Sequence, residues 1–373
     1  MADENKAPET VSVTIDGLTV TVPKGTRILD AAVQAGIEVP HYCYHPGLSA
    51  PSQCRMCLVE VEKVPKMVPS CTGTVADGQV IHTQSENALK AREGVLEFYL
   101  VNHPLDCPVC DQSGECKLQD YVAAEGPAMG RLKEPKRVFG RDDFGGDVLY
   151  YGDRCIMCTR CVRFMREVAQ DERLGVVQRG NRAVLDTFFD EGVDGNIWAD
   201  NVIDICPVGA LVSKDFLHKA RAWDLDRIPS VCPNCTQGCN VRLETKENAV
   251  VRMKPRTNEE VNSYWMCDYG RLNYEWINRG GRIEAPLVRE GDRMVPVSWS
   301  VALTRLAEAI RAQAGEARAV VSPFLSNEDL GAVRRVMDAV GGGTGVFRCE
   351  QGEEVVLPGF PTLALRPDRA AIR

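Results

Sequence analysis

The 373-residue chain is 44% hydrophobic and 26% charged, which is the composition of an ordinary globular protein of about two to four domains. Its formal net charge of −8 argues against a nucleic-acid-binding surface. The sequence contains no run of about 18 apolar residues, so no membrane span is predicted. The first ten residues lack the features of a secretory signal peptide. The chain has sixteen cysteines, and many of them fall in tight C-x2-C groups, which indicate metal binding rather than disulfides.

The first part of the chain predicts a β-grasp domain. Residues 11–22 alternate β-branched residues around an Asp16-Gly17 pair, which is typical of a hairpin. Residues 27–35 predict a short helix that ends at Gly36. Two further strands are expected at Leu58–Glu62 and Gln79–Thr83.

Four cysteines in this region form the first ligand set, spaced C-x10-C-x2-C-x13-C: Cys43, Cys54, Cys57 and Cys71. The central C-x2-C matches a plant-type ferredoxin, although the first gap is ten residues instead of four. Zinc is the alternative occupant. His41 and His45 flank Cys43 as in a Rieske-like centre, but the four cysteines already complete a ligand shell, so we expect both histidines at the surface or behind the ligands.

The second ligand set combines one imidazole with three thiols, spaced H-x3-C-x2-C-x5-C: His103, Cys107, Cys110 and Cys116. Residues 86–102 have helical periodicity and lead into it, and residues 123–147 predict a connecting loop. Zinc would accept these four ligands, and so would a [4Fe–4S] cluster. The neighbouring cysteine sets favour the cluster.

The third ligand set begins as a bacterial ferredoxin motif and takes its last member from a distant Cys-Pro: Cys155, Cys158, Cys161 and Cys206. Met165 stands where the motif would have its fourth cysteine, so we expect one [4Fe–4S] cluster here instead of two. A helix over Thr159–Gln170 would direct its N-terminal amides at the negative cluster.

The fourth ligand set is spaced C-x2-C-x3-C-x27-C: Cys232, Cys235, Cys239 and Cys267. Residues 240–255 between its last two members predict a hairpin. In isolation this set is also compatible with a zinc ribbon.

The C-terminal part predicts the beginning of an α/β domain. We expect a helix at 298–315 capped by Ser298 or Ser300, a buried strand at 317–323, and a helix at 326–341 capped by Ser326. The GGGTG stretch at 341–345 is interpreted as a helix-to-strand turn instead of a phosphate-binding loop. Cys349 has no other cysteine near it, and the chain ends too soon to complete a doubly wound sheet, so a truncated product is expected.

Four ligand sets in this order resemble the large, G-type iron–sulfur subunit of bacterial NADH–quinone oxidoreductase, respiratory complex I, over residues 10 to about 323. The resemblance implies a [2Fe–2S] cluster on the first set and a [4Fe–4S] cluster on each of the others, with the fourth off the main electron route. It implies an α+β multidomain chain with five parts: a [2Fe–2S] ferredoxin-type domain (10–88), a His/Cys3 [4Fe–4S] domain (89–147), a ferredoxin-like [4Fe–4S] domain (148–225), a molybdopterin-oxidoreductase-type [4Fe–4S] domain (226–282) and an incomplete α/β domain (283–373).

The same resemblance implies an electron-relay subunit with no catalytic residue, flavin or pterin of its own. Its partners would be a flavin-bearing, NADH-oxidising subunit, a ferredoxin-like iron–sulfur subunit near the membrane and other complex I subunits, on the cytoplasmic side of the bacterial inner membrane. A subunit of an NAD-linked formate dehydrogenase or hydrogenase is the nearest alternative, although such chains usually carry a two-cluster ferredoxin module. A zinc-binding scaffold protein is the alternative from another class.

Overall fold

The computed structural model describes residues 9–235, 237–312, 317–321, 325–346 and 364–365. The chain divides into two compact units. The first holds residues up to 232 together with 239–277, and the second holds 233–238 together with the chain from 278 onward. Within the described ranges, no helix is both long and apolar enough to cross a membrane.

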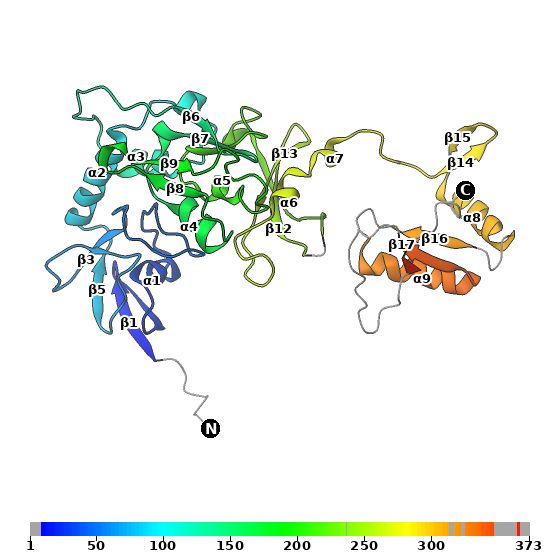
Figure 1. Ribbon diagram of the computed structural model, residues 1–373. Helices are drawn as coiled ribbons and strands as arrows, with labels where there is room; N and C mark the ends of the chain where they lie inside the picture. The colour runs from blue at the N-terminus through cyan, green and yellow to red at the C-terminus, as the bar shows by residue number, and fades with distance from the viewer. Residues whose placement is uncertain (1–8, 236, 313–316, 322–324, 347–363, 366–373) are drawn as a thin grey trace. The chain divides into compact units, whose positions relative to one another are not determined.

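The N-terminal part of the first unit is a β-grasp fold, as predicted. Its five-stranded sheet has the order β2-β1-β5-β3-β4, in which β1 and β5 are parallel, and α1 covers one face (Figure 1). The elements are β1 (Thr10–Ile15), β2 (Leu18–Pro23), α1 (Ile28–Gln34), β3 (Leu58–Val61), β4 (Val68–Pro69) and β5 (Gln79–His82). Asp16 and Gly17 have φ values of 44° and 85°, so the predicted pair makes the hairpin turn.

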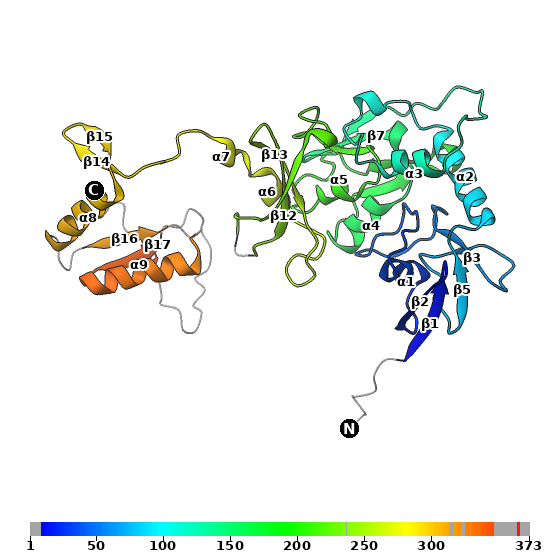
Figure 2. The same ribbon diagram turned by 180° about the vertical axis from the view of Figure 1, so that it is seen from behind.

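Two helices follow, α2 (Glu86–Leu100) and α3 (Lys117–Glu125), separated by the short helix η1 (Cys107–Val109). They run beside each other (Figure 2) and are joined by Arg92, a fully buried side chain of α2 whose guanidinium pairs with Glu125. The predicted helix at 86–102 is therefore confirmed. Sequence patterns did not predict α3, and the connecting loop expected at 123–147 begins inside it and contains the strand β6.

The next part surrounds α4 (Arg160–Glu167), which is shorter than the predicted helix. A three-stranded sheet of order β10-β7-β6 and the β8–β9 hairpin lie around it. The bounds are β6 (Arg141–Asp143), β7 (Val148–Tyr151), η2 (Gly152–Arg154), β8 (Leu174–Val177), η3 (Gly180–Arg182), β9 (Val184–Thr187), α5 (Asn201–Ile205) and β10 (Leu211–Ser213). One apolar core runs from Tyr42 and Leu96 to Phe164 and Leu211, so this part and the α2–α3 segment fold around a shared interior.

The first unit ends with a small antiparallel sheet of order β11-β12-β13, which confirms the predicted hairpin and adds a third strand. Its elements are η4 (Ala222–Asp224), β11 (Asp226–Val231), β12 (Asn240–Lys246), β13 (Ala249–Pro255), α6 (Asp268–Leu272) and α7 (Glu275–Asn278). A separate small core around Val241 and Met253 holds the sheet against the segment that carries Cys267.

The second unit has the α/β character predicted for it. Strands β16 (Arg318–Val321), β17 (Gly343–Val346) and β18 (Ala364–Leu365) are parallel, and α9 (Asn327–Val340) lies along β16 and β17 (Figure 1). The β14 (Leu287–Glu290) and β15 (Arg293–Pro296) hairpin was not predicted, whereas the helix α8 (Trp299–Ala312) was.

The local predictions in this unit had mixed outcomes. Ser326 caps α9 as expected, accepting from the Asp329 amide at 3.1 Å. Gly341 has a φ of 67° and ends α9, and β17 begins at Gly343, so Gly341 and Gly342 make the expected helix-to-strand turn and the rest of GGGTG lies in β17. The strand predicted at 317–323 is present as β16, but the prediction that it is buried was wrong, because only Val321 of β16 is buried. Cys349 lies outside the described residues.

Candidate metal centres

The third ligand set encloses a pocket. Its four cysteines all line one apolar pocket, together with side chains such as Leu185 and Val208. Met157 and Thr159, between the cysteines, have left-handed φ values of 52° and 57°, which let the loop curl so that Cys155, Cys158 and Cys161 all line the same pocket. Sequence reasoning therefore selected four residues that the fold brings together.

Burial makes these thiols poor acids. Loss of hydration raises the pKa of Cys155 to about 12 and the pKa of Cys158 to about 11, and it raises the pKa of Cys161 well above its usual value. Four such thiols facing one cavity require a strongly positive occupant before they can be held as thiolates. This donor chemistry fits a metal cluster.

The first ligand set is also brought together. Hydrogen bonds from Cys54 and Cys71 lower the pKa of Cys43 to about 2, and a hydrogen bond from Cys71 lowers the pKa of Cys57 to about 7. The same contacts raise the pKa of Cys54 and of Cys71. All four side chains are buried. Cys43 contacts Cys54 and Cys71, and Cys71 contacts Cys57, so these contacts connect the four cysteines inside the β-grasp domain.

The second ligand set is only partly assembled by the fold. Cys110 and Cys116 are buried, Cys107 is exposed, and the three influence one another electrostatically. His103 lines a neighbouring pocket with Tyr99 and Cys155. Its Nδ1 is buried and has no hydrogen-bond partner among the residues described, and burial lowers its pKa to about 4. A buried, neutral imidazole with a vacant nitrogen is suited to bind a metal.

The fourth ligand set has three cysteines in the first compact unit and one, Cys235, in the second. A methyl group on Gly270 would lie 3.1 Å from the Cys232 sulfur and 3.4 Å from the Cys267 sulfur, so both sulfurs border this glycine. The Cys232 amide donates to the Cys239 carbonyl at 2.8 Å. Cys235 is exposed and lies in residues 233–238, which belong to the second unit. No set of three or more His, Cys, Asp or Glu side chains in the described ranges is arranged around a single metal ion.

Shared contacts link the first and third sets. The buried Arg163 of α4 donates to the Cys43 carbonyl at 2.5 Å and to the Cys158 carbonyl at 3.5 Å. Tyr99 of α2 donates to the Cys54 carbonyl at 3.1 Å, and burial, followed by the charges of Cys54 and Cys158, raises its pKa. These contacts fix the two sets beside each other.

The second and third sets are joined in the same way. The Lys117 amide, directly after Cys116, donates to the Pro207 carbonyl at 3.1 Å. A methyl group on Gly209 would lie 2.2 Å from the Cys110 sulfur, so only glycine allows this approach. The third set therefore adjoins both the first and the second, although its cysteines follow both in sequence.

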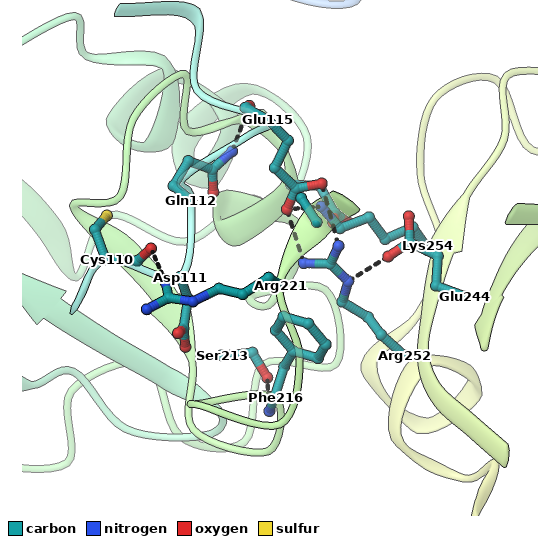
Figure 3. Close-up of polar contacts among 12 residues, drawn as sticks. Cys110, Asp111, Gln112, Glu115, Ser213, Phe216, Arg221, Glu244, Arg252 and Lys254 are labelled. Carbon is teal, nitrogen blue, oxygen red and sulfur yellow. Dashed lines mark hydrogen bonds and ion pairs between the residues drawn. The ribbon is translucent and has the colours of Figure 1, made fainter. Parts of the chain in front are cut away.

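Buried charges tie the second set to the small sheet of the fourth. Figure 3 shows Arg252 of β13 between two carboxylates, with bonds of 2.9 and 3.1 Å to Glu115 and a further bond to Glu244. Burial by itself would raise the pKa of Glu115, but the charges of Lys254 and Arg252 outweigh it and lower that pKa to about 2. Glu115 directly precedes Cys116, so its ion pair with Arg252 helps to hold the backbone next to this ligand.

Sequence reasoning missed the arginines that organise these sets. Arg154, Arg160 and Arg163 stand within the RCIMCTRCVR run, and all three are mostly buried with carbonyl or carboxylate partners. The sequence did contain a signal for them: three arginines stand among three cysteines, and a negatively charged site needs compensating positive charge. His41 and His45 are both half-buried, and His45 stacks on Trp265 at 5.1 Å between the ring centres.

Four protein-family models match the chain in the predicted order. They are described as a 2Fe-2S iron-sulfur cluster binding domain (8–86), an NADH-ubiquinone oxidoreductase-G iron-sulfur binding region (92–128), an NADH-quinone oxidoreductase subunit 3, ferredoxin-like domain (145–212), and a molybdopterin oxidoreductase Fe4S4 domain (225–279).

Whole-chain relatives agree with these matches. The chain is 41% identical over 318 residues to the G-type subunit of the NADH-quinone oxidoreductase of Rickettsia conorii, covering 85% of this chain and 47% of that one. It is 40% identical over 336 residues to the mitochondrial NADH-ubiquinone oxidoreductase 78 kDa subunit of Candida albicans, covering 89% and 46%. The chain belongs to the G-type subunit family of NADH–quinone oxidoreductases. It spans about half the length of the curated relatives that it matches.

A solved structure gives a further point of comparison for this G-type homologue. A chain of the NAD⁺-reducing [NiFe]-hydrogenase in its H2-reduced state superimposes with a TM-score of 0.51 and is 29% identical, covering 56% of this chain and 90% of that one. The hydrogenase chain therefore shares the fold of part of this molecule.

Proposed function

We propose that this chain is the iron–sulfur relay subunit of an NADH–quinone oxidoreductase, carrying electrons singly from a flavoprotein subunit toward quinone. The observation that supports the proposal is that the third ligand set contacts both the first and the second. Arg163 bridges the first and third sets, and Gly209 and Pro207 contact the second set from the third. Three adjoining sets form a path through the unit.

The proposed cofactors are one [2Fe–2S] cluster and three [4Fe–4S] clusters. When bound, such clusters supply the one-electron chemistry, which protein side chains do not provide. The proposed ligands of the [2Fe–2S] cluster are Cys43, Cys54, Cys57 and Cys71. The proposed ligands of the [4Fe–4S] clusters are His103 with Cys107, Cys110 and Cys116; Cys155, Cys158 and Cys161 with Cys206; and Cys232, Cys235 and Cys239 with Cys267. The five domains proposed from sequence keep the boundaries 10–88, 89–147, 148–225, 226–282 and 283–373.

The chain's own residues would exclude water, hold the ligands and compensate charge. The apolar walls of the third-set cavity keep water away from its thiolates. Arg163 compensates negative charge between the first and third sets, and Arg252 braces Glu115 beside the second. The exposed Cys107 is where the path reaches the surface of this chain.

The proposed partners are the flavin-bearing NADH-oxidising subunit, which would deliver electrons, and a ferredoxin-like iron–sulfur subunit, which would receive them. Other complex I subunits would complete the assembly, peripheral to the cytoplasmic side of the bacterial inner membrane. The similarity to the hydrogenase chain supports one alternative, an iron–sulfur subunit of an NAD-linked hydrogenase or formate dehydrogenase. The G-type relatives, at about 40% identity over most of the chain, favour the first proposal.

Metal analysis tests the proposal directly. After anaerobic reconstitution with iron and sulfide, the full chain should bind about 14 irons, the number in one [2Fe–2S] and three [4Fe–4S] clusters. Replacing Cys349 with Ser should leave this count unchanged, which makes it the matched control. Stoichiometric zinc with little iron would favour the zinc-scaffold alternative and reject the relay.

The partner assignment needs a separate measurement. The reconstituted chain without flavin should accept electrons from dithionite or a flavoprotein, and NADH alone should not bleach it, because the sequence lacks a dinucleotide-binding fingerprint. Bleaching of the pure chain by NADH would contradict the proposed division of labour between subunits.

A further inference from the structure

Arg154 stands directly before Cys155 of the third set, but its guanidinium faces the second. The side chain is 6% exposed. Its Nη1 donates to the Gly209 carbonyl at 3.5 Å, and its guanidinium lies 4.0 Å from the centre of the Tyr151 ring. Gly209 is the residue against which the Cys110 sulfur packs. A buried positive charge from the third-set loop therefore lies beside the second set.

The counter-ion of Arg154 also belongs to the second set. Asp106 directly precedes Cys107, and its Oδ2 accepts from Arg154 Nη2 at 2.9 Å and from Nε at 3.0 Å. The Asp106 side chain is 39% exposed, so water screens its charge more strongly than that of the buried Arg154. The pair therefore leaves a net positive field on its buried side.

Two polar partners of the Arg154 guanidinium adjoin the second set, because Asp106 precedes Cys107 and Gly209 packs against the Cys110 sulfur. The position of this charge therefore favours an effect on the second set.

We propose that Arg154 is a positioning residue that raises the reduction potential of the site held by the second set relative to the site held by the third. The inference rests on the proposed iron–sulfur occupancy and adds a determinant of the direction of transfer. One electron leaves the third-set site, which is oxidised, and enters the second-set site, which is reduced. A buried cation stabilises the added negative charge at the receiving site.

The test uses the full chain, reconstituted anaerobically and titrated potentiometrically while each site is followed by EPR. Arg154→Gln should lower the second-set midpoint and leave the third-set midpoint in place. The equilibrium constant for moving an electron from the third site to the second should fall about tenfold, and a tenfold change corresponds to about 59 mV for a one-electron couple. Arg154→Lys should retain most of the parent value, because it keeps the charge.

Two further variants keep the test decisive if Arg154→Gln folds poorly. Asp106→Asn removes the screening carboxylate and should shift the second-set midpoint in the opposite direction, upward. Arg141→Gln is the matched control, because Arg141 also lies over the Tyr151 ring, at 5.9 Å, but is exposed. It should change the equilibrium constant less than about twofold, since water screens exposed charges.

The inference is overturned if Arg154→Gln shifts both midpoints equally, or if Asp106→Asn lowers the second-set midpoint or leaves it unchanged. An effect of Arg141→Gln as large as that of Arg154→Gln would also overturn it. A parent chain with neither iron nor EPR signals would instead reject the proposed function. A parent with all its signals and no selective shift rejects the role of Arg154 alone.

Discussion

The second and third ligand sets adjoin each other, yet the protein treats them differently. The cysteines of the third set line one apolar cavity, and Cys158 and Cys161 are 8% and 5% exposed within the shared core. The second set reaches the rim through one member: Cys107 is exposed and its neighbour Leu105 is 89% exposed, whereas Cys110 and Cys116 are buried. One site is built into the interior, and the other is held in a loop against it.

The difference corresponds to two requirements of an electron-relay chain, insulation from solvent and access for a partner. An enclosed site is insulated from solvent, and its ligands also serve as packing for the core. A site at the rim gives a partner access, and here it is also supported by individual contacts from Arg154, Gly209 and Glu115. Changes to the third set should therefore affect folding, and changes to the second should affect redox properties.

The largest effect should come from removing a ligand at the enclosed site. Cys161→Ser should abolish the third-set EPR signal and lower the thermal midpoint by on the order of 10 °C, because metal binding is coupled to folding there. Cys107→Ser is the matched change at the rim and should affect only the second-set signal. Equal losses of thermal stability in the two variants would refute the distinction between interior and rim.

His103 provides the second test of the rim site. His103→Ala should leave a labile second-set site, while the other three sets keep their signals. His103→Cys should retain the site and lower its midpoint by on the order of 100 mV, because an added thiolate makes reduction harder, the reverse of histidine's effect in Rieske centres. Redox titration followed by EPR measures both variants. Unchanged signals and midpoints in His103→Ala would remove His103 from the ligands.

Local patterns predicted much of the fold and all four members of the enclosed site. The Asp16-Gly17 hairpin, the helix before His103 and the α/β end all follow from periodicity and turn chemistry, which act over a few residues. Cys206 could be assigned to the third set although it lies 45 residues after Cys161. The ferredoxin motif lacks its fourth cysteine, and the Cys-Pro pair at Cys206 matches the missing ligand.

What sequence could not predict is how the sets lie relative to one another. Arg154 is next to Cys155 in sequence, but its charge acts on the second set, and Gly209 follows Cys206 but accommodates Cys110. Such relationships depend on packing between segments that lie far apart in the chain, which leaves no periodic trace in sequence. The helix α3 was missed for a similar reason, since its buried contacts, Leu118 and Tyr121, belong to the shared core.

A smaller effect is expected at Gly209, where the two sets meet. Gly209→Ala would place a methyl group 2.2 Å from the Cys110 sulfur, and such overpacking costs about 1–3 kcal/mol. The second-set signal should broaden or become labile, although Gly209 belongs to the segment of the third set. Gly94→Ala in α2 is the control, because its methyl group meets open space and should stabilise the helix by about 0.5–1 kcal/mol. If EPR shows greater damage at the third set, the assignment of Gly209 to the second set is wrong.

The smallest effect should arise at Ser85, which begins the helix that leads to His103. Its hydroxyl accepts from the Ala88 amide at 3.2 Å, so Ser85→Ala removes the N-cap of α2 and costs about 1 kcal/mol. Amide hydrogen exchange should show the first turn of α2 opening more readily by about that amount. The second-set midpoint should not move, because the buried Arg92–Glu125 pair holds the helix further along. Ser85→Thr preserves the cap and serves as the control. A shift in midpoint on losing this cap would mean that the rim site depends on the whole of α2 and not on the braces beside its ligands.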